Sequence, residues 1–232
     1  MTFAAFAGRA ADTPITEGHQ DLRFNFAPAT DWSLGVFDHD TATEHSPPTV
    51  WFDVSAGAEA VVPAGAQWGF LGQAAGEPLW ILPQVQDPDL PWLGTSTEGT
   101  AAGVLQNNDM RLTLTAAAGP GAFSLFTVSA FGTPNAVMTT SDGLSAADAI
   151  NTRANRHAHY NWAFTEPGTY LLTFQASGTP VGAASPLFSD AVTLEFRVVP
   201  EPSAPLLLAA GLLAWRWAAG VSSSSRNTNP KT

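Results

Sequence analysis

Apolar residues recur at every second position along most of this chain, which is the spacing of β-strands that bury one face. Ten segments carry this pattern: residues 22–26, 32–37, 50–54, 67–71, 79–82, 111–115, 122–128, 136–139, 170–176 and 191–199. Glycine and proline occur between them, for example at residues 118–121, and these residues favour turns. Only residues 145–155 have the composition of a short helix. We therefore predict an all-β fold, an antiparallel immunoglobulin-like β-sandwich.

The strands predicted at 170–176 and 191–199 have the features of a hairpin that closes such a sandwich. The turn sequence Pro167-Gly168 precedes the first strand, and Tyr170 follows the turn. In immunoglobulin-like sandwiches a tyrosine at this place bonds back to the backbone a few residues upstream and fixes a corner. We expect Tyr170 to have this role.

The charge balance and the absence of cysteine limit what the domain can bind. The chain has 232 residues, and residues 12–199 suffice for one β domain with a sizeable core. Up to Val199 there are 19 acidic and 6 basic residues, which leaves a net charge of −13. Such a charge repels polyanions, so nucleic acid is excluded as a partner. With no cysteine, disulfides and thiolate metal ligands are excluded too.

Residues 200–232 differ in composition from the rest of the chain. They begin with Pro200, Glu201 and Pro202, and an apolar stretch follows at 205–221, in which Arg216 is the one charged residue. The uninterrupted apolar run is shorter than the ~20 residues that span a bilayer comfortably, but the arginine lies near its end and can reach the headgroups. We predict a hydrophobic anchor helix with Arg216 as membrane stop. The alternative is a terminal helix packed on the domain.

This layout resembles the PEP-CTERM sorting tail of exported bacterial proteins. The resemblance implies that Pro200-Glu201-Pro202 is recognised by a sorting protease or transpeptidase of the exosortase type. It also implies that the chain is held transiently in the membrane and reaches the cell surface or extracellular matrix. Residues 1–11 then fit the end of a truncated signal peptide, because their small residues suit a cleavage region.

Two histidine motifs point to a metal ion. In His157-Ala158-His159 the two imidazoles share one face if the segment is a strand, and both can then ligate one ion. Further ligands would come from His19, Asp21 or His39. Imidazole and carboxylate without thiolate suit Zn²⁺, Mn²⁺ or Fe²⁺. The alternative is a strand end that carries two ordinary histidines.

Several motifs, taken in chain order, resemble the choice-of-anchor M domain of surface-anchored proteins. They are Gly18-His19-Gln20-Asp21, Trp80 to Gln84, Pro91-Trp92-Leu93-Gly94, Gly119 to Phe123, and His157 to Phe164 leading into Pro167 to Tyr170. The resemblance covers residues 18–199 and implies a surface-anchored module. Some relatives are associated with metal ABC transporters, which makes metal handling a hypothesis for this chain.

Two further kinds of site have weaker patterns. Trp80 and Trp92 flank a proline-rich loop and could stack on sugar rings of an envelope polysaccharide, although such tryptophans more often close the ends of a core. The pairs Asp87/Asp89 and Asp38/Asp40 could supply oxygen ligands to Ca²⁺.

The serine-hydrolase, zinc-protease and phosphate-loop motifs are missing from the sequence, so we do not expect an enzyme.

Two functions remain from these patterns. The first is an exported, surface-anchored structural or adhesive module of the bacterial envelope or extracellular matrix, without enzymatic activity. The alternative is a divalent-metal-binding surface protein for Zn²⁺ or Mn²⁺, associated with metal uptake. The second requires His19 and Asp21 to lie close to His157 and His159 in space.

Overall fold

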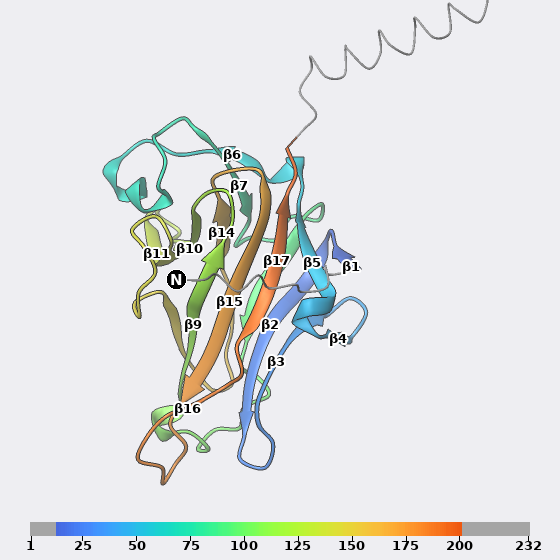
Figure 1. Ribbon diagram of the computed structural model, residues 1–232, viewed down its shortest axis with the longest axis vertical. Coiled ribbons are helices and arrows are strands. Elements are labelled where there is room, and N and C mark those ends of the chain that lie inside the picture. Colours follow the sequence, from blue (N-terminus) through green and yellow to red (C-terminus); the bar gives the residue numbers. More distant parts are fainter. Residues whose placement is uncertain (1–12, 201–232) are drawn as a thin grey trace, which may run out of the picture. The chain divides into compact units, whose positions relative to one another are not determined.

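The computed structural model describes residues 13–200, and these residues form three β-sheets (Figure 1). The β-rich fold predicted from the sequence is confirmed. Several expectations concern segments outside the described residues: the signal-peptide end at 1–11, the sorting residues Glu201 and Pro202, the apolar stretch 205–221 and Arg216. Within 13–200, no helix is long and apolar enough to cross a membrane.

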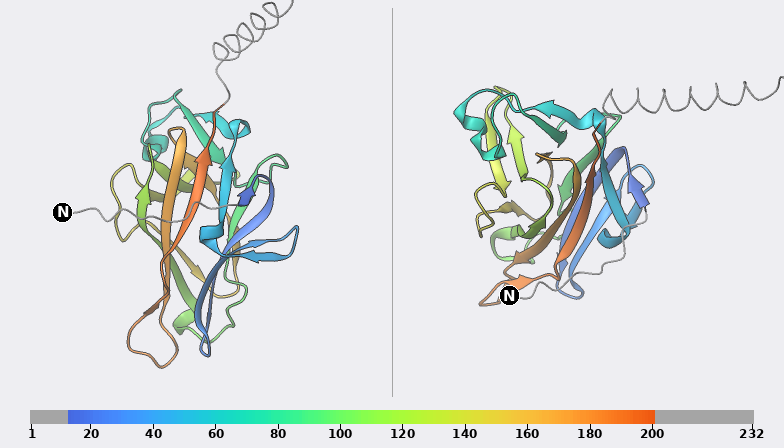
Figure 2. Two further views of the ribbon diagram at one scale, coloured as in Figure 1. Left: turned by 45° about the vertical axis from the view of Figure 1, so that its right-hand side comes forward. Right: turned by 45° about the horizontal axis from the view of Figure 1, so that its top comes forward.

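The largest sheet has seven strands and contains the predicted closing hairpin. Its strands, in spatial order, are β1 (Thr13–Ile15), β5 (Val50–Val54), β17 (Val192–Val198), β15 (Gly168–Gly178), β9 (Asp109–Ala118) and β12 (Ala149–Arg153), with β16 (Leu187–Phe188) paired to β15. The long strands β15 and β17 run antiparallel and lie side by side in both views of Figure 2.

The other two sheets have five strands each. One contains β11 (Pro134–Thr139), β10 (Phe123–Val128), β14 (Asn161–Phe164), β7 (Pro78–Leu82) and β6 (Glu59–Val61). The other, here called the histidine sheet, contains β13 (His157–His159), β8 (Pro91–Ser96), β2 (Gly18–Ala27), β3 (Asp31–Asp38) and β4 (Thr43–His45). Only Tyr160 separates β13 from β14, so the chain passes between these two sheets there.

The three sheets share one hydrophobic core. Trp162 of β14 is fully buried, and its ring lies 6.0 Å from that of Phe174 and 5.5 Å from that of Phe196, both in the seven-stranded sheet. Its indole N–H donates a hydrogen bond of 3.1 Å to the carbonyl of Leu93 in the histidine sheet. Large aromatic residues of this kind bury much area and fix how layers pack.

Not every strand pair is antiparallel, which corrects one part of the predicted fold. Strand β5 runs parallel to both β1 and β17, and β2 runs parallel to β8. A tight hairpin can join only antiparallel strands. These partners are far apart in the chain, so no short turn fixes their relative direction. Short-range turn signals therefore could not predict these pairs.

Two local predictions were wrong. Residues 67–71 are not a strand but lie in η3, one of four short 3₁₀ helices within residues 13–200: η1 (Pro47–Thr49), η2 (Ala56–Ala58), η3 (Ala66–Leu71) and η4 (Gln106–Asn108). Gly65 and Gly72, with φ of 117° and 79°, turn the chain sharply at both ends of η3. Residues 145–155 are not a helix, because 149–153 form β12 and pair with β9. Tertiary pairing here overrides the helix preference of alanine.

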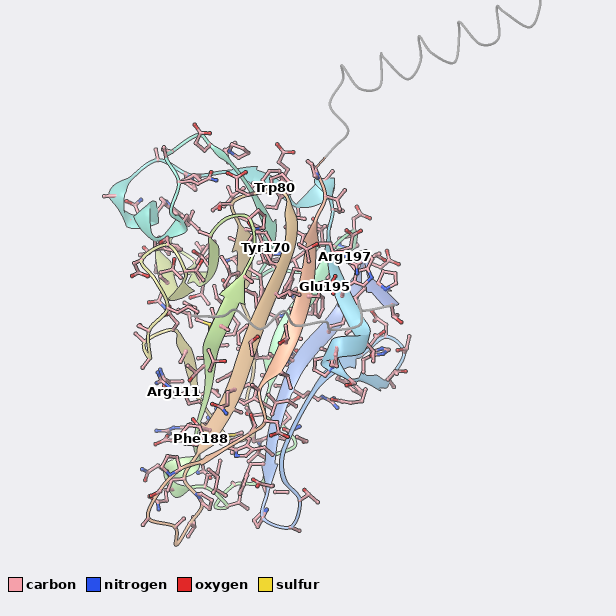
Figure 3. All side chains as sticks on the ribbon, in the orientation of Figure 1. Trp80, Arg111, Tyr170, Phe188, Glu195 and Arg197 are labelled. Carbon is pink, nitrogen blue, oxygen red and sulfur yellow. The ribbon has the colours of Figure 1, made fainter. Side chains whose placement is uncertain are left out.

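Tyr170 has the corner role that its position predicts. Its hydroxyl donates a 2.9 Å hydrogen bond to the carbonyl of Glu166 and accepts one of 3.1 Å from the same residue's N–H. The side chain is buried at the start of β15 (Figure 3). It therefore fixes the turn that leads into the closing hairpin.

Candidate metal centre

The register of the histidine sheet brings the two histidine motifs together. His159 of β13 lies opposite Gly94 of β8, and Gly94 lies opposite Asp21 of β2. His19 lies opposite Trp92, two residues along the same strands. Residues directly opposite each other share a face of the sheet. The side chains of Asp21 and His157, which are 136 residues apart in sequence, thus meet on one surface.

This surface is the outer face of the sheet. Leu22, Phe24 and Phe26 of β2 belong to the core. Because successive side chains point to opposite faces, His19 and Asp21 point away from the core. Within the cluster formed there, His19 and His157 are partly exposed to solvent.

Asp21 is the centre of the cluster. Its carboxylate is fully buried, although it lies on the outer face, because imidazoles cover it. His157 Nε2 lies 2.9 Å from its Oδ1, and His39 Nε2 lies 2.8 Å from its Oδ2. His19 Nε2 is 3.7 Å from Oδ1. A buried carboxylate is costly unless positive charge or hydrogen-bond donors compensate it, and the ion-pair partners within 13–200 are all imidazoles.

Four of these residues place ligand atoms at the spacing of a metal site. The ligand atoms of His19, Asp21, His157 and His159 lie within 4.8 Å of one another. Three of the separations are 2.9, 3.4 and 3.7 Å, the middle one between the Nε2 atoms of His19 and His157. A tetrahedron with metal–ligand bonds of about 2.0–2.1 Å has edges of about 3.3 Å. The three atoms therefore outline one face of such a tetrahedron.

His159 has polar ring atoms that no described protein group satisfies. Both of its ring nitrogens are buried and have no hydrogen-bond partner among the described residues. Burial, and then the nearby His157, lower the pKa of His159 to about 4. The imidazole is therefore neutral at physiological pH and keeps a lone pair for a ligand. Unpaired buried polar atoms are rare in folded proteins, and a bound ion would account for one of these two nitrogens.

His19 is also held in the neutral form. Burial lowers its pKa, and His39 and His157 act in the same direction, while Asp21 opposes them. Its backbone N–H donates to Oδ2 of Asp40 at 3.1 Å. Neutral imidazole is the form that coordinates a metal.

Gly94 makes room for the cluster and was not identified as a site residue from the sequence. A Cβ atom at this position would overlap Oδ1 of Asp21 and lie 2.8 Å from Cε1 of His159. Glycine inside a strand often marks such a close approach. That rule, applied to Gly94 in β8, could have identified it.

The acidic pairs proposed for Ca²⁺ have other roles in the structure. Oδ1 of Asp38 accepts hydrogen bonds from the backbone N–H groups of Asp40 and Thr41. Oδ1 of Asp87 likewise accepts one from the N–H of Asp89. Such bonds are typical of turns.

The two tryptophans proposed for sugar stacking make other contacts in the structure. Trp80 is 4% exposed and belongs to the core, which is the more common role of such residues (Figure 3). Trp92 stacks on His159 with ring centroids 3.7 Å apart and planes inclined by 6°. Its indole N–H donates to the carbonyl of Gln84 at 3.0 Å. In this structure His159 therefore packs against the ring of Trp92.

Comparison of the chain with known family models, with curated proteins and with solved structures finds no match. The resemblances to the choice-of-anchor M domain and to the PEP-CTERM tail therefore rest on the sequence motifs alone. What the arrangement can do follows from its chemistry: three imidazoles and one carboxylate can hold a divalent cation at the outer face of the histidine sheet.

Proposed function

We propose that this protein binds a divalent metal ion through His19, Asp21, His157 and His159. The observation that carries the proposal is the convergence of these four ligand atoms over Gly94, with both ring nitrogens of His159 left unpaired. Of the two functions that the sequence indicates, the geometry thus favours metal binding over a purely structural or adhesive module.

Zn²⁺ is the ion that suits the site best. It takes nitrogen and carboxylate ligands in tetrahedral geometry, and the spacing of the three atoms from His19, Asp21 and His157 is close to that expected from its bond lengths. Mn²⁺ is the alternative and would need additional ligands, such as water, to reach six. Ca²⁺ suits the site less, because it takes six to eight oxygen ligands.

The setting of this activity remains part of the proposal. The Pro200-Glu201-Pro202 motif and the apolar stretch at 205–221 support an exported protein, sorted by an exosortase-type enzyme and anchored at the cell surface. The corner formed by Tyr170 supports an immunoglobulin-like sandwich as the scaffold. A surface-anchored metal-binding domain would act in uptake or storage of metal at the envelope, without catalysis.

Calorimetric titration of the metal-stripped full-length chain tests the proposal. We expect one Zn²⁺ per chain and a weaker response to Mn²⁺. The double variant His157→Ala/His159→Ala should lose stoichiometric binding. His45→Ala is the matched control, because His45 ends β4 and is not one of the ligand residues, and it should bind as the wild type does. Absence of heat in the wild type would instead favour the structural module.

A further inference from the structure

His39 contacts the carboxylate of Asp21 but is not one of the four candidate ligand residues. Its Nε2 contacts Oδ2 of Asp21 at 2.8 Å, whereas His157 and His19 approach Oδ1. The two oxygens of one carboxylate therefore have different partners. His39 was predicted from the sequence as a direct ligand, whereas in the structure its Nε2 faces the second oxygen of Asp21.

Several contacts hold the His39 ring in place. Its backbone N–H donates a 2.9 Å hydrogen bond to the carbonyl of His19. Its ring stacks on that of His19, with centroids 4.0 Å apart and planes inclined by 8°. The ring of Phe37 meets it at 90°, with centroids 4.8 Å apart. A side chain fixed in this way directs its Nε2 at one oxygen with little freedom.

We propose that His39 is a positioning residue that sets the metal selectivity of the site by occupying Oδ2 of Asp21. The inference rests on the proposed function. With Oδ2 engaged by His39, Oδ1 is the Asp21 oxygen that faces His19 and His157, and the four residues each supply one donor atom. Four donors suit tetrahedral Zn²⁺. Mn²⁺ and Ca²⁺ prefer six or more ligands, and the second carboxylate oxygen would be their nearest source.

Hydrogen bonds to a ligating carboxylate are known to tune metal sites in general, and their loss typically costs 10–100-fold in affinity. Here the effect should differ between ions. Loss of the His39 contact removes the group that orients Asp21 for Zn²⁺. It also frees Oδ2 of Asp21 for ions that take more ligands, such as Mn²⁺. The ratio of the Zn²⁺ affinity to the Mn²⁺ affinity should therefore fall when the His39 contact is lost.

Two variants separate the hydrogen bond from the ring. His39→Phe keeps an aromatic ring to stack on His19 but has no donor. His39→Gln loses the ring but carries an amide N–H at the same distance along the side chain as Nε2. Each full-length variant is titrated with Zn²⁺ and Mn²⁺ in competition with a chromophoric chelator. Co²⁺ is added as a spectroscopic probe, because its visible absorption is intense in tetrahedral sites and weak in octahedral ones.

We expect His39→Phe to lower the Zn²⁺/Mn²⁺ affinity ratio about tenfold and to weaken the Co²⁺ bands. His39→Gln should keep both close to the wild type. An unchanged ratio and spectrum in His39→Phe would overturn the inference but leave the metal site standing. Equal losses in both variants would also overturn it, because they would assign the effect to the ring or to direct ligation. A wild type that takes up no metal would overturn both the inference and the proposed function.

Discussion

His157 Nε2 lies 2.9 Å from Oδ1 of Asp21, although 136 residues separate them in the sequence. The two belong to β13 and β2, which do not pair directly but lie on either side of β8. A metal ion bound between them would tie the three-residue edge strand β13 to the middle of the histidine sheet. The site is therefore a link between distant parts of the chain, and its chemistry can be tested one residue at a time.

Asp21→Asn should reduce Zn²⁺ affinity by at least about 100-fold, because it removes the negative ligand while it keeps the side chain's size. Calorimetric titration measures the change. Asp40→Asn serves as the comparison, since Asp40 accepts the backbone N–H of His19 but is not one of the four ligand residues. Equal affinity in Asp21→Asn and in the wild type would contradict the assigned ligand set.

Gly94→Ala should weaken Zn²⁺ binding and lower the free energy of unfolding by about 1–3 kcal/mol, because the new methyl group overlaps Asp21 and crowds His159. Chemical denaturation and metal titration together measure both effects. The matched control is Gly69→Ala, because a Cβ atom there meets nothing within 4 Å. If Gly94→Ala behaves like Gly69→Ala, the absence of a side chain at Gly94 is not needed for Zn²⁺ binding.

The metal-free protein should lose stability as the pH falls below about 6.5. Burial lowers the folded-state pKa of His159 to about 4 and also lowers that of His19, so the unfolded chain binds more protons in this range. Their contribution is fully present above the unfolded pKa and is lost progressively as the pH falls. Denaturation in the presence of a chelator, at pH 7 and pH 5, measures the slope. His159→Phe should have a smaller slope, and an equal slope would argue against this origin.

Replacement of Pro200, Glu201 and Pro202 by alanine should trap or mislocalise the full-length protein in its host, because the proposed sorting motif is removed. Cell fractionation and surface labelling measure the distribution. Unchanged surface display would refute the sorting role and leave the metal site unaffected. A variant in the basic end of the chain, Lys231→Ala, keeps the tripeptide and provides the comparison.

Much of the fold follows from local patterns in the sequence, but the pairing of distant strands does not. The alternation in 50–54 predicts β5, whose buried positions alternate as expected. Its parallel pairing with β1 and β17 depends on contacts between segments far apart, which no local signal encodes. Strand β8 was missed because Pro91 and Gly94 interrupt the apolar pattern that identifies strands.

The residues of the candidate metal centre could be named from the sequence because few side-chain types bind metals and these occur in two short motifs. His19, Asp21, His157 and His159 were all named from the sequence, and the structure brings them together. The role that we propose for His39 could not be predicted, because it depends on which oxygen of Asp21 its ring faces. The stacking of Trp92 on His159 likewise depends on sheet register.

X-ray diffraction from zinc-soaked crystals, measured on both sides of the zinc absorption edge, tests the metal site most directly. The account predicts one strong anomalous peak over Gly94, about 2.0–2.2 Å from His19 Nε2, Asp21 Oδ1, His157 Nε2 and one ring nitrogen of His159. His39 should remain outside bonding distance of the ion and in contact with Oδ2 of Asp21. Crystals with no peak at this cluster, or with zinc held only by other residues, would contradict it.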